Sequence, residues 1–162
     1  MFNGTLGVYP HRKIHIELEE GAVPKHSRPY PVLRIHLSTF KKEMVHLVEI
    51  GVLAPQDESE WASLSFITPK KDGKVRWISD LCELNKAVKR RVYPLRVITE
   101  ILRKRTGYEF FTKLDISIQY YTFELDEKSQ DLCTIVTLFG KYKYLRLLMG
   151  LKCLPDIAQS IM

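Results

Sequence analysis

Asp115 is the residue whose type and position most clearly suggest chemistry. It follows an apolar and aromatic run at 109–114 that predicts a buried strand, and the aromatic Tyr120 comes five positions later. A carboxylate at the end of a strand can hold a metal ion. Phosphoryl transfer uses divalent ions held in this way, together with cations that grip a triphosphate. The simpler interpretation of one aspartate after a strand is a cap or a turn.

The cations that such chemistry requires are grouped along the chain. The formal net charge is +6, from 25 Lys and Arg against 19 Asp and Glu. The clusters are Lys70, Lys71, Lys74 and Arg76; Lys89, Arg90 and Arg91; Arg103, Lys104 and Arg105; and Lys141, Lys143 and Arg146, which alternate with Tyr142 and Tyr144. Grouped cations favour a polyanionic partner such as nucleic acid, because each one near a phosphate releases a condensed counterion. A basic soluble protein without such a partner is the alternative.

Helices and strands must position these residues. Apolar spacing predicts a helix from Ser38, its candidate cap, to Gly51, its candidate end. Two β-prone runs at 65–68 and 75–78 flank Asp72-Gly73, and an Asp-Gly pair between such runs predicts a hairpin. The other predicted elements are helices at 81–88, from 97 to near 107 and from 155 onwards, and strands at 121–125, 132–137 and 142–147. This order, without regular strand–helix alternation, indicates the α+β class.

The first part of the chain differs from the rest. Residues 1–34 contain four prolines and little periodicity, so we expect an extended arm with one possible strand at 13–18. Residues 35–162 are enough for one domain. The three cysteines are scattered and lack metal-ligand spacing, which favours a reduced intracellular compartment. No apolar run approaches the roughly 20 residues that span a bilayer, so no membrane partner is expected.

Eight short motifs occur in one order along the chain. They are Trp61-Ala62-Ser63, the run at 69–76, the run at 80–85, Tyr93-Pro94-Leu95, Phe111-x-x-Leu114-Asp115, the run at 139–142, Met149-Gly150-Leu151 and Pro155-x-x-x-Gln159. Each motif alone is common, but the ordered set is specific. Together they closely resemble the N-terminal half of the reverse transcriptase domain of gypsy-type LTR retrotransposons, from about His11 to the last residue.

The resemblance implies a right-hand polymerase. Residues 35–162 would be its fingers and a partial palm, truncated before the second catalytic motif, and residues 1–34 look like the connector that follows the protease. Asp115 matches the catalytic, metal-binding aspartate, and the carbonyl of Ile116 is an added ligand for one of two Mg²⁺ ions. The nucleotide-binding residues implied are Lys70, Arg76, Ile116, Tyr120 and Met149. The cations that we expect to contact nucleic acid are Lys71, Lys74, Lys89, Arg90, Lys141 and Lys143.

Partners and location follow from the same resemblance. It implies an RNA/DNA template-primer, deoxynucleoside triphosphates and the remainder of a Pol polyprotein as partners. It also implies work in cytoplasmic particles and in the nucleus.

Two departures from the family pattern change the expectation. The family's paired aspartates lie downstream of the helix that begins at Pro155, and these 162 residues do not contain them. One carboxylate cannot hold two metal ions, so we expect the chain alone to be inactive. Cys82 stands where the family has arginine, which we expect to leave Asp80 or Glu83 without its partner. The alternatives are a non-catalytic nucleic-acid-binding module and the product of a pseudogene.

Overall fold

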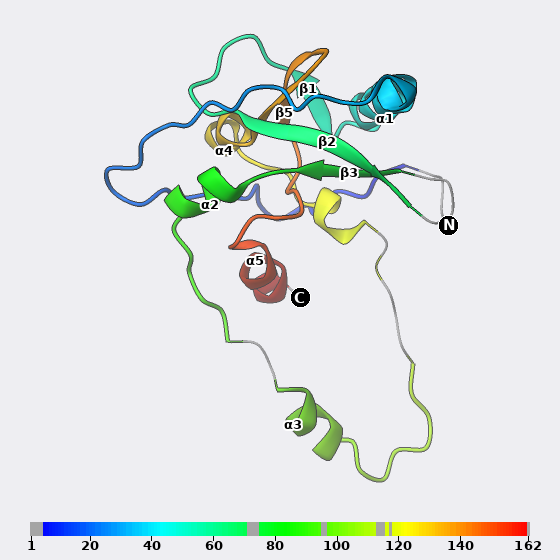
Figure 1. Ribbon diagram of the computed structural model, residues 1–162. Helices are drawn as coiled ribbons and strands as arrows, with labels where there is room; N and C mark the ends of the chain where they lie inside the picture. Colours follow the sequence, from blue (N-terminus) through cyan, green and yellow to red (C-terminus); the bar gives the residue numbers. More distant parts are fainter. Residues whose placement is uncertain (1–4, 71–74, 95–96, 113–115, 117, 162) are drawn as a thin grey trace.

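A computed structural model describes residues 5–70, 75–94, 97–112, 116 and 118–161. These residues form a mixed sheet with helices around it (Figure 1). The helices are α1 (Leu37–Glu49), α2 (Cys82–Ala87), α3 (Ile98–Arg103), α4 (Glu127–Leu132) and α5 (Leu154–Ile161), with 3-10 turns η1 (Arg34–His36) and η2 (Gln119–Thr122). The strands are β1 (Leu53–Pro55), β2 (Ser63–Pro69), β3 (Val75–Ser79), β4 (Thr134–Thr137) and β5 (Gly140–Tyr144). The predicted α+β class is confirmed.

The sheet joins strands that are far apart in the sequence. Its order is β1-β5-β4-β2-β3, and β2 with β4 is the parallel pair. The other neighbours are antiparallel. All four residues of β4 are buried, as expected for a strand in the middle of a sheet.

Helix α1 follows from its apolar spacing. Phe40, Met44 and Leu47 are buried on one face. Its end is as predicted, because Gly51 has a φ of +70° and the Val52 N–H donates to the Leu47 carbonyl at 2.9 Å. Its predicted start is wrong. The helix begins at Leu37, directly after η1, and Ser38 does not cap it.

The predicted hairpin is present as β2 and β3. Its register runs from Ser65 opposite Ser79 to Pro69 opposite Val75, and its turn at 71–74 lies outside the described residues. A polar network fastens it to β5. The Tyr144 hydroxyl lies 2.9 Å from Ser79 Oγ and accepts from Trp77 Nε1 at 3.0 Å. Burial raises the pKa of Tyr144, so the phenol stays neutral and the network keeps its protons.

The N-terminal segment is part of the core. Ile14 and Ile16 are each 3% exposed, and both belong to the main apolar cluster. The possible strand at 13–18 is replaced by single bridges, of Ile14 with Leu125 and of Leu18 with Val88. The segment therefore pairs with different parts of the chain on its two sides and forms no continuous ladder.

The strand predicted at 109–114, directly before Asp115, is wrong over its described part. Residues 109–112 are irregular, and Phe110 and Phe111 are 89% and 66% exposed. Figure 1 shows α3 far from the sheet, and the apolar side chains of Val97, Ile98 and Leu102 are also exposed. Strand-prone residues form a strand only when a partner pairs with them, and the described residues offer none here. Residues 113–115 lie outside the description.

Two further strand boundaries differ from expectation. Residues 119–122 form η2, and 123–125 make only isolated bridges in place of a strand at 121–125. The strand predicted at 132–137 begins at Thr134, because α4 occupies the preceding residues. Asp126 caps α4 by accepting from the Ser129 N–H at 2.8 Å. The strand predicted at 142–147 is β5, which ends at Tyr144.

The remaining helix predictions are confirmed. Helix α2 lies within 81–88 and buries Leu84, and α5 begins at Leu154 with Pro155 in its first turn. Leu154 and Ala158 face the core. None of the helices in the described ranges is long and apolar enough to cross a membrane.

Candidate functional site

The centre of the predicted site lies partly outside the described residues. Asp115, Lys71 and Lys74 are not among them, so the structure does not place these side chains. Ile116 is described and is 56% exposed. The described part of the site consists of the segments on either side of Asp115 and the predicted cations.

The segment after Asp115 has an unusual backbone. Ile118 has φ 47° and ψ 33°, the left-handed conformation, which a β-branched residue rarely adopts. Its carbonyl accepts from the Tyr121 N–H at 3.0 Å and so starts η2. Tyr120 lies in this turn, half-buried against the core. Strain of this kind persists only where the surroundings hold it in place.

The N-terminal segment and the chain beyond β5 supply that support. The Tyr9 N–H donates to the Thr122 carbonyl at 2.8 Å. Arg146, with 12% of its side chain exposed, lies 3.5 Å from the Glu124 carboxylate and donates to the Tyr121 carbonyl at 3.4 Å. Arg146 was one of the clustered cations, but its guanidinium holds this backbone together.

The side chain of Asn85 holds the loop that carries Met149. The Asn85 side chain donates from Nδ2 to the Gly150 carbonyl at 2.7 Å and accepts from the Lys152 N–H at 2.8 Å. Gly150 has a φ of +102°, which favours glycine. Met149 itself is 69% exposed at the tip of this loop. Asn85 is a positioning residue that was not assigned a role from the sequence, although it ends one of the eight motifs.

The hairpin presents two of the predicted nucleotide-binding cations to solvent. Lys70 and Arg76 are exposed, and in the described part of the chain neither lies within 4 Å of a carboxylate. Arg76 is next to Trp77, whose ring packs on Phe40 with centroids 4.9 Å apart. The packing of Trp77 thus anchors the hairpin, while Lys70 and Arg76 carry no carboxylate partner from the described ranges and can meet an anion.

The other predicted cations divide into paired and unpaired residues. Arg90 Nε donates to Asp156 Oδ2 at 2.7 Å, and Lys143 Nζ lies 3.4 Å from Asp131 Oδ1. Lys89 and Lys141 have no such carboxylate among the described residues. Two of these four cations therefore already have a partner within the chain.

Asp156 is a buried acid that sequence reasoning missed. Its side chain is 3% exposed, and it accepts from Arg90 and from the Tyr93 N–H at 2.9 Å. The Arg90 hydrogen bond, followed by the Tyr93 N–H, holds the pKa of Asp156 below its usual value. The one signal in the sequence is an acid inside the apolar stretch that begins at Leu151. Asp156 ties α5 to the segment at 90–93.

The expectation about Cys82 is wrong. Asp80 is exposed and accepts from the Cys82 N–H at 3.0 Å, and hydrogen bonds from the Cys82 thiol and N–H lower the pKa of Asp80. Glu83 pairs with Lys86 at 2.5 Å. Both acids therefore have a partner, and in each case it comes from α2.

No group of three His, Cys, Asp or Glu side chains within the described ranges is arranged to hold a metal ion. Because Asp115 lies outside those ranges, this finding leaves the metal prediction at Asp115 open. The described carboxylates, taken by themselves, do not form a metal site.

Comparison with known proteins places the chain among retroelement proteins. No protein-family model matches it. It is 35% identical over its whole length to the uncharacterized protein K02A2.6 of Caenorhabditis elegans, and it covers 13% of that protein. It is 28% identical over 144 residues to the retrovirus-related Pol polyprotein from transposon 297 of Drosophila melanogaster, matching 86% of the chain and 14% of the polyprotein. The transposon Tf2-3 polyprotein of Schizosaccharomyces pombe is 27% identical over 128 residues, 79% of the chain and 10% of the polyprotein.

Solved structures share the fold. The crystal structure of prototype foamy virus protease-reverse transcriptase matches with a TM-score of 0.82 at 22% identity, over 98% of the chain and 21% of the viral protein. A foamy viral protease-reverse transcriptase in complex with an RNA/DNA hybrid matches with a TM-score of 0.76 at 18% identity, over 98% of the chain and 21% of the viral protein. The chain spans between 10% and 14% of the length of the three relatives named above. The named relatives of the chain include retrotransposon Pol polyproteins, and the chain matches one segment of each of them.

Proposed function

We propose that the chain is the fingers and first palm segment of an RNA-directed DNA polymerase. The observation that carries this proposal is the likeness of fold to a protease-reverse transcriptase over 98% of the chain. The ordered motifs are a second line of support, because they concern the amino-acid sequence whereas the comparison of folds concerns the path of the backbone. Asn85 connects the two lines of support, since this motif residue holds the loop of another motif, Met149-Gly150, in place.

In this proposal the hairpin and the loops beneath it receive the incoming nucleotide. Lys70 and Arg76 would contact the triphosphate, because both are exposed and free of carboxylates among the described residues. Tyr120 would pack under the deoxyribose and Met149 would line the pocket, as the family resemblance implies. The strained turn at Ile118 would hold Tyr120 in a fixed position.

Magnesium belongs to the same proposal. Asp115 and the Ile116 carbonyl would hold one ion, and two such ions activate the attacking oxygen and stabilise the leaving group in this class of reaction. The described residues add no cluster of acids to this set. We therefore propose that the 162-residue polypeptide by itself does not extend a primer.

The partners proposed for the complete protein follow its relatives. One solved neighbour is a complex with an RNA/DNA hybrid and another a complex with double-stranded DNA. We propose a template-primer duplex, deoxynucleoside triphosphates and the remainder of the Pol polyprotein as partners of this segment. We also propose that it works in cytoplasmic particles and in the nucleus.

Binding of an RNA/DNA hybrid tests the proposal directly. Fluorescence anisotropy of a labelled hybrid, in the presence of the matching deoxynucleoside triphosphate, should show saturable binding by the chain. Arg76→Ala should weaken this binding about threefold at moderate salt, because Arg76 would contact the triphosphate. Lys128→Ala is the matched control, because Lys128 is an exposed cation on α4, remote in sequence from the hairpin. Equal losses from the two variants would mean that only net charge matters, and the assignment of the hairpin would fail.

Primer extension tests the catalytic part. With Mg²⁺, an RNA template and a DNA primer, the chain alone should add no nucleotides. Extension by the isolated chain that disappears in Asp115→Asn would show that these residues suffice for catalysis. That result would overturn the proposed dependence on acids from elsewhere.

A non-catalytic nucleic-acid-binding module is the second candidate. Lys70 and Arg76, which are exposed and have no carboxylate partner among the described residues, favour it as much as they favour a polymerase segment. The two candidates differ in their response to a nucleotide. A deoxynucleoside triphosphate that matches the template should stabilise the complex with hybrid in a polymerase segment, whereas a simple binding module should not distinguish matched from mismatched nucleotides.

A further inference from the structure

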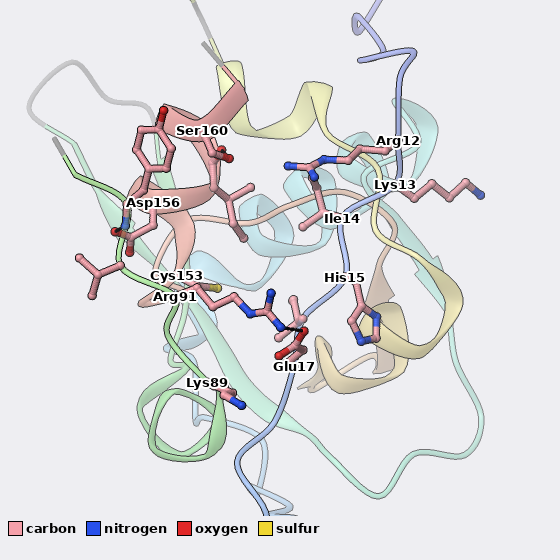
Figure 2. A pocket seen from close by; sticks show the side chains of 14 residues that line it. Arg12, Lys13, Ile14, His15, Glu17, Lys89, Arg91, Cys153, Asp156 and Ser160 are labelled. Atoms are coloured by element: carbon pink, nitrogen blue, oxygen red, sulfur yellow. Dashed lines mark hydrogen bonds and ion pairs between the residues drawn. The ribbon is translucent and has the colours of Figure 1, made fainter. Parts of the chain in front are cut away.

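A cleft of about 510 Å³ is lined by residues of neither the hairpin nor the Met149 loop (Figure 2). Residues 12–17 form one wall, Lys89 and residues 91–93 form another, and Cys153, Asp156, Ile157 and Ser160 close it from the side of α5. Pockets of this size hold small organic ligands. Of the described residues predicted to bind nucleotide or nucleic acid, Lys89 alone lines it.

The charges in the cleft do not cancel. Its lining contains the cations Arg12, Lys13, Lys89 and Arg91 and the acids Glu17 and Asp156. Arg91 Nη2 donates to Glu17 Oε1 at 2.6 Å, and Asp156 is neutralised from outside the lining by Arg90. Arg12, Lys13 and Lys89 lie near no carboxylate that the described residues provide. His15 also lines the cleft, with its Nδ1 2.6 Å from Asp126 Oδ2.

Two arginines line the cleft, one on each of two facing walls. Figure 2 shows Arg12 extending from the N-terminal segment towards α5, and Arg91 reaching from the opposite wall to Glu17. A guanidinium has five N–H donors, so Arg91 keeps donors for an anion while it holds Glu17. Planar guanidinium groups bind phosphate oxygens in pairs, which a lysine cannot do.

The walls of the cleft are apolar between these charges. Ile14, Val92, Ile157 and Cys153 line it, and Tyr93 adds an aromatic side chain. A free phosphate would leave this surface in water. A ligand with an apolar or aromatic body beside its phosphates would cover it and gain roughly 25 cal/mol for each Å² of apolar surface that it buries.

We propose that this cleft binds a small molecule with two or more phosphates on an aromatic body, such as a nucleoside polyphosphate. Arg12, Lys89 and Arg91 contact the phosphates, and Tyr93 and Ile157 contact the ring. The site is separate from the hairpin and the Met149 loop, and it does not depend on the proposed polymerase function. A chain that binds no template-primer can still bind this ligand.

Calorimetric titration of the full chain tests the proposal, with inorganic triphosphate and ATP as the two probes. ATP should bind with one site per chain and more tightly than triphosphate, because only ATP covers the apolar wall. Arg12→Ala should weaken ATP binding by about tenfold, the effect of losing one or two charged hydrogen bonds. Arg28→Ala is the matched control, because Arg28 is an exposed arginine of the same N-terminal segment and does not line the cleft.

A variant with the opposite effect separates binding from folding. Glu17→Gln removes the carboxylate that competes for Arg91 and should tighten ATP binding several-fold, which a damaged fold cannot do. The proposal fails if no saturable binding occurs, if Arg28→Ala weakens binding as much as Arg12→Ala, or if triphosphate binds as tightly as ATP. It also fails if Arg76→Ala abolishes binding while Arg12→Ala does not, because the ligand would then occupy the hairpin.

Discussion

Replacing Lys70 and Arg90 separately by alanine would separate nucleic acid contacts from internal ion pairs. Both residues lie in basic clusters of the sequence, and each replacement removes one positive charge. The structure distinguishes them. Lys70 is exposed with no carboxylate nearby in the described ranges, whereas Arg90 Nε lies 2.7 Å from Asp156 Oδ2. Only the loss of Lys70 should therefore change how binding to nucleic acid depends on salt.

The size of this effect follows from counterion release. Each phosphate contact with a single strand contributes about −0.7 to the slope of log K against log salt. One contact therefore costs about 2.6-fold in affinity between roughly 50 and 200 mM salt. Four of the described cations that were predicted to bind nucleotide or nucleic acid have no carboxylate partner among the described residues: Lys70, Arg76, Lys89 and Lys141. If each contacts one phosphate, the slope is about −2.8 and the loss of affinity is about 50-fold.

The assay is anisotropy of a labelled single strand at four or five salt concentrations. Lys70→Ala should make the slope less steep by about 0.7, and Arg90→Ala should leave it unchanged. Arg90→Ala should instead lower the melting temperature, because Asp156 stays buried with only the Tyr93 N–H as partner. If Arg90→Ala reduced the slope and left the melting temperature alone, the division into paired and free cations would be wrong.

Three further predictions concern stability. Ile14→Ala should reduce the free energy of unfolding by about 2–5 kcal/mol in urea titrations, because Ile14 is 3% exposed in the core. Its neighbour Lys13 is exposed, so Lys13→Ala should change the free energy of unfolding by less than about 0.5 kcal/mol. Equal effects would mean that the N-terminal segment does not pack. Ile118→Gly should increase the free energy of unfolding by about 1 kcal/mol, since glycine adopts a φ of 47° without strain; a loss would show that the turn is relaxed. The pKa of Asp156 lies below its ordinary value of 3.8, so its contribution to the free energy of unfolding is complete above that pH and is lost as the pH falls towards the folded-state pKa. Asp156→Asn should therefore make the free energy of unfolding less dependent on pH in this range. An unchanged pH profile would contradict the ion pair.

The predictable parts of the fold are those with a local cause. The end of α1 at Gly51 and the hairpin follow from nearby residues, because a left-handed glycine and an Asp-Gly pair act within a few positions. The single bridges of the N-terminal segment could not be predicted in this way. The Ile16 N–H donates to Ser129 Oγ across 113 positions, and no periodicity of either segment encodes that pairing.

The candidate site also has features that the sequence predicts and features that it does not. Charge clustering located the cations, but it could not tell which of them already have partners. The Asp156 that holds Arg90 is 66 positions away, and its burial depends on the packing of α5. The strand predicted at 109–112 shows the opposite error, because the composition of Phe110 and Phe111 is strand-like while the fold supplies no neighbour among the described residues.

The distance in sequence between the N-terminal segment and its partners has a consequence for biosynthesis. Ile14 donates its N–H to the Glu124 carbonyl, so it leaves the ribosome long before the residues that it packs against exist. At about 5–20 residues per second, the delay for these 110 residues is about 6–22 s. Throughout this time Ile14 and Ile16 face water on the nascent chain, where a chaperone that binds short apolar stretches would find them. Slow codons between the two segments would prolong that exposure.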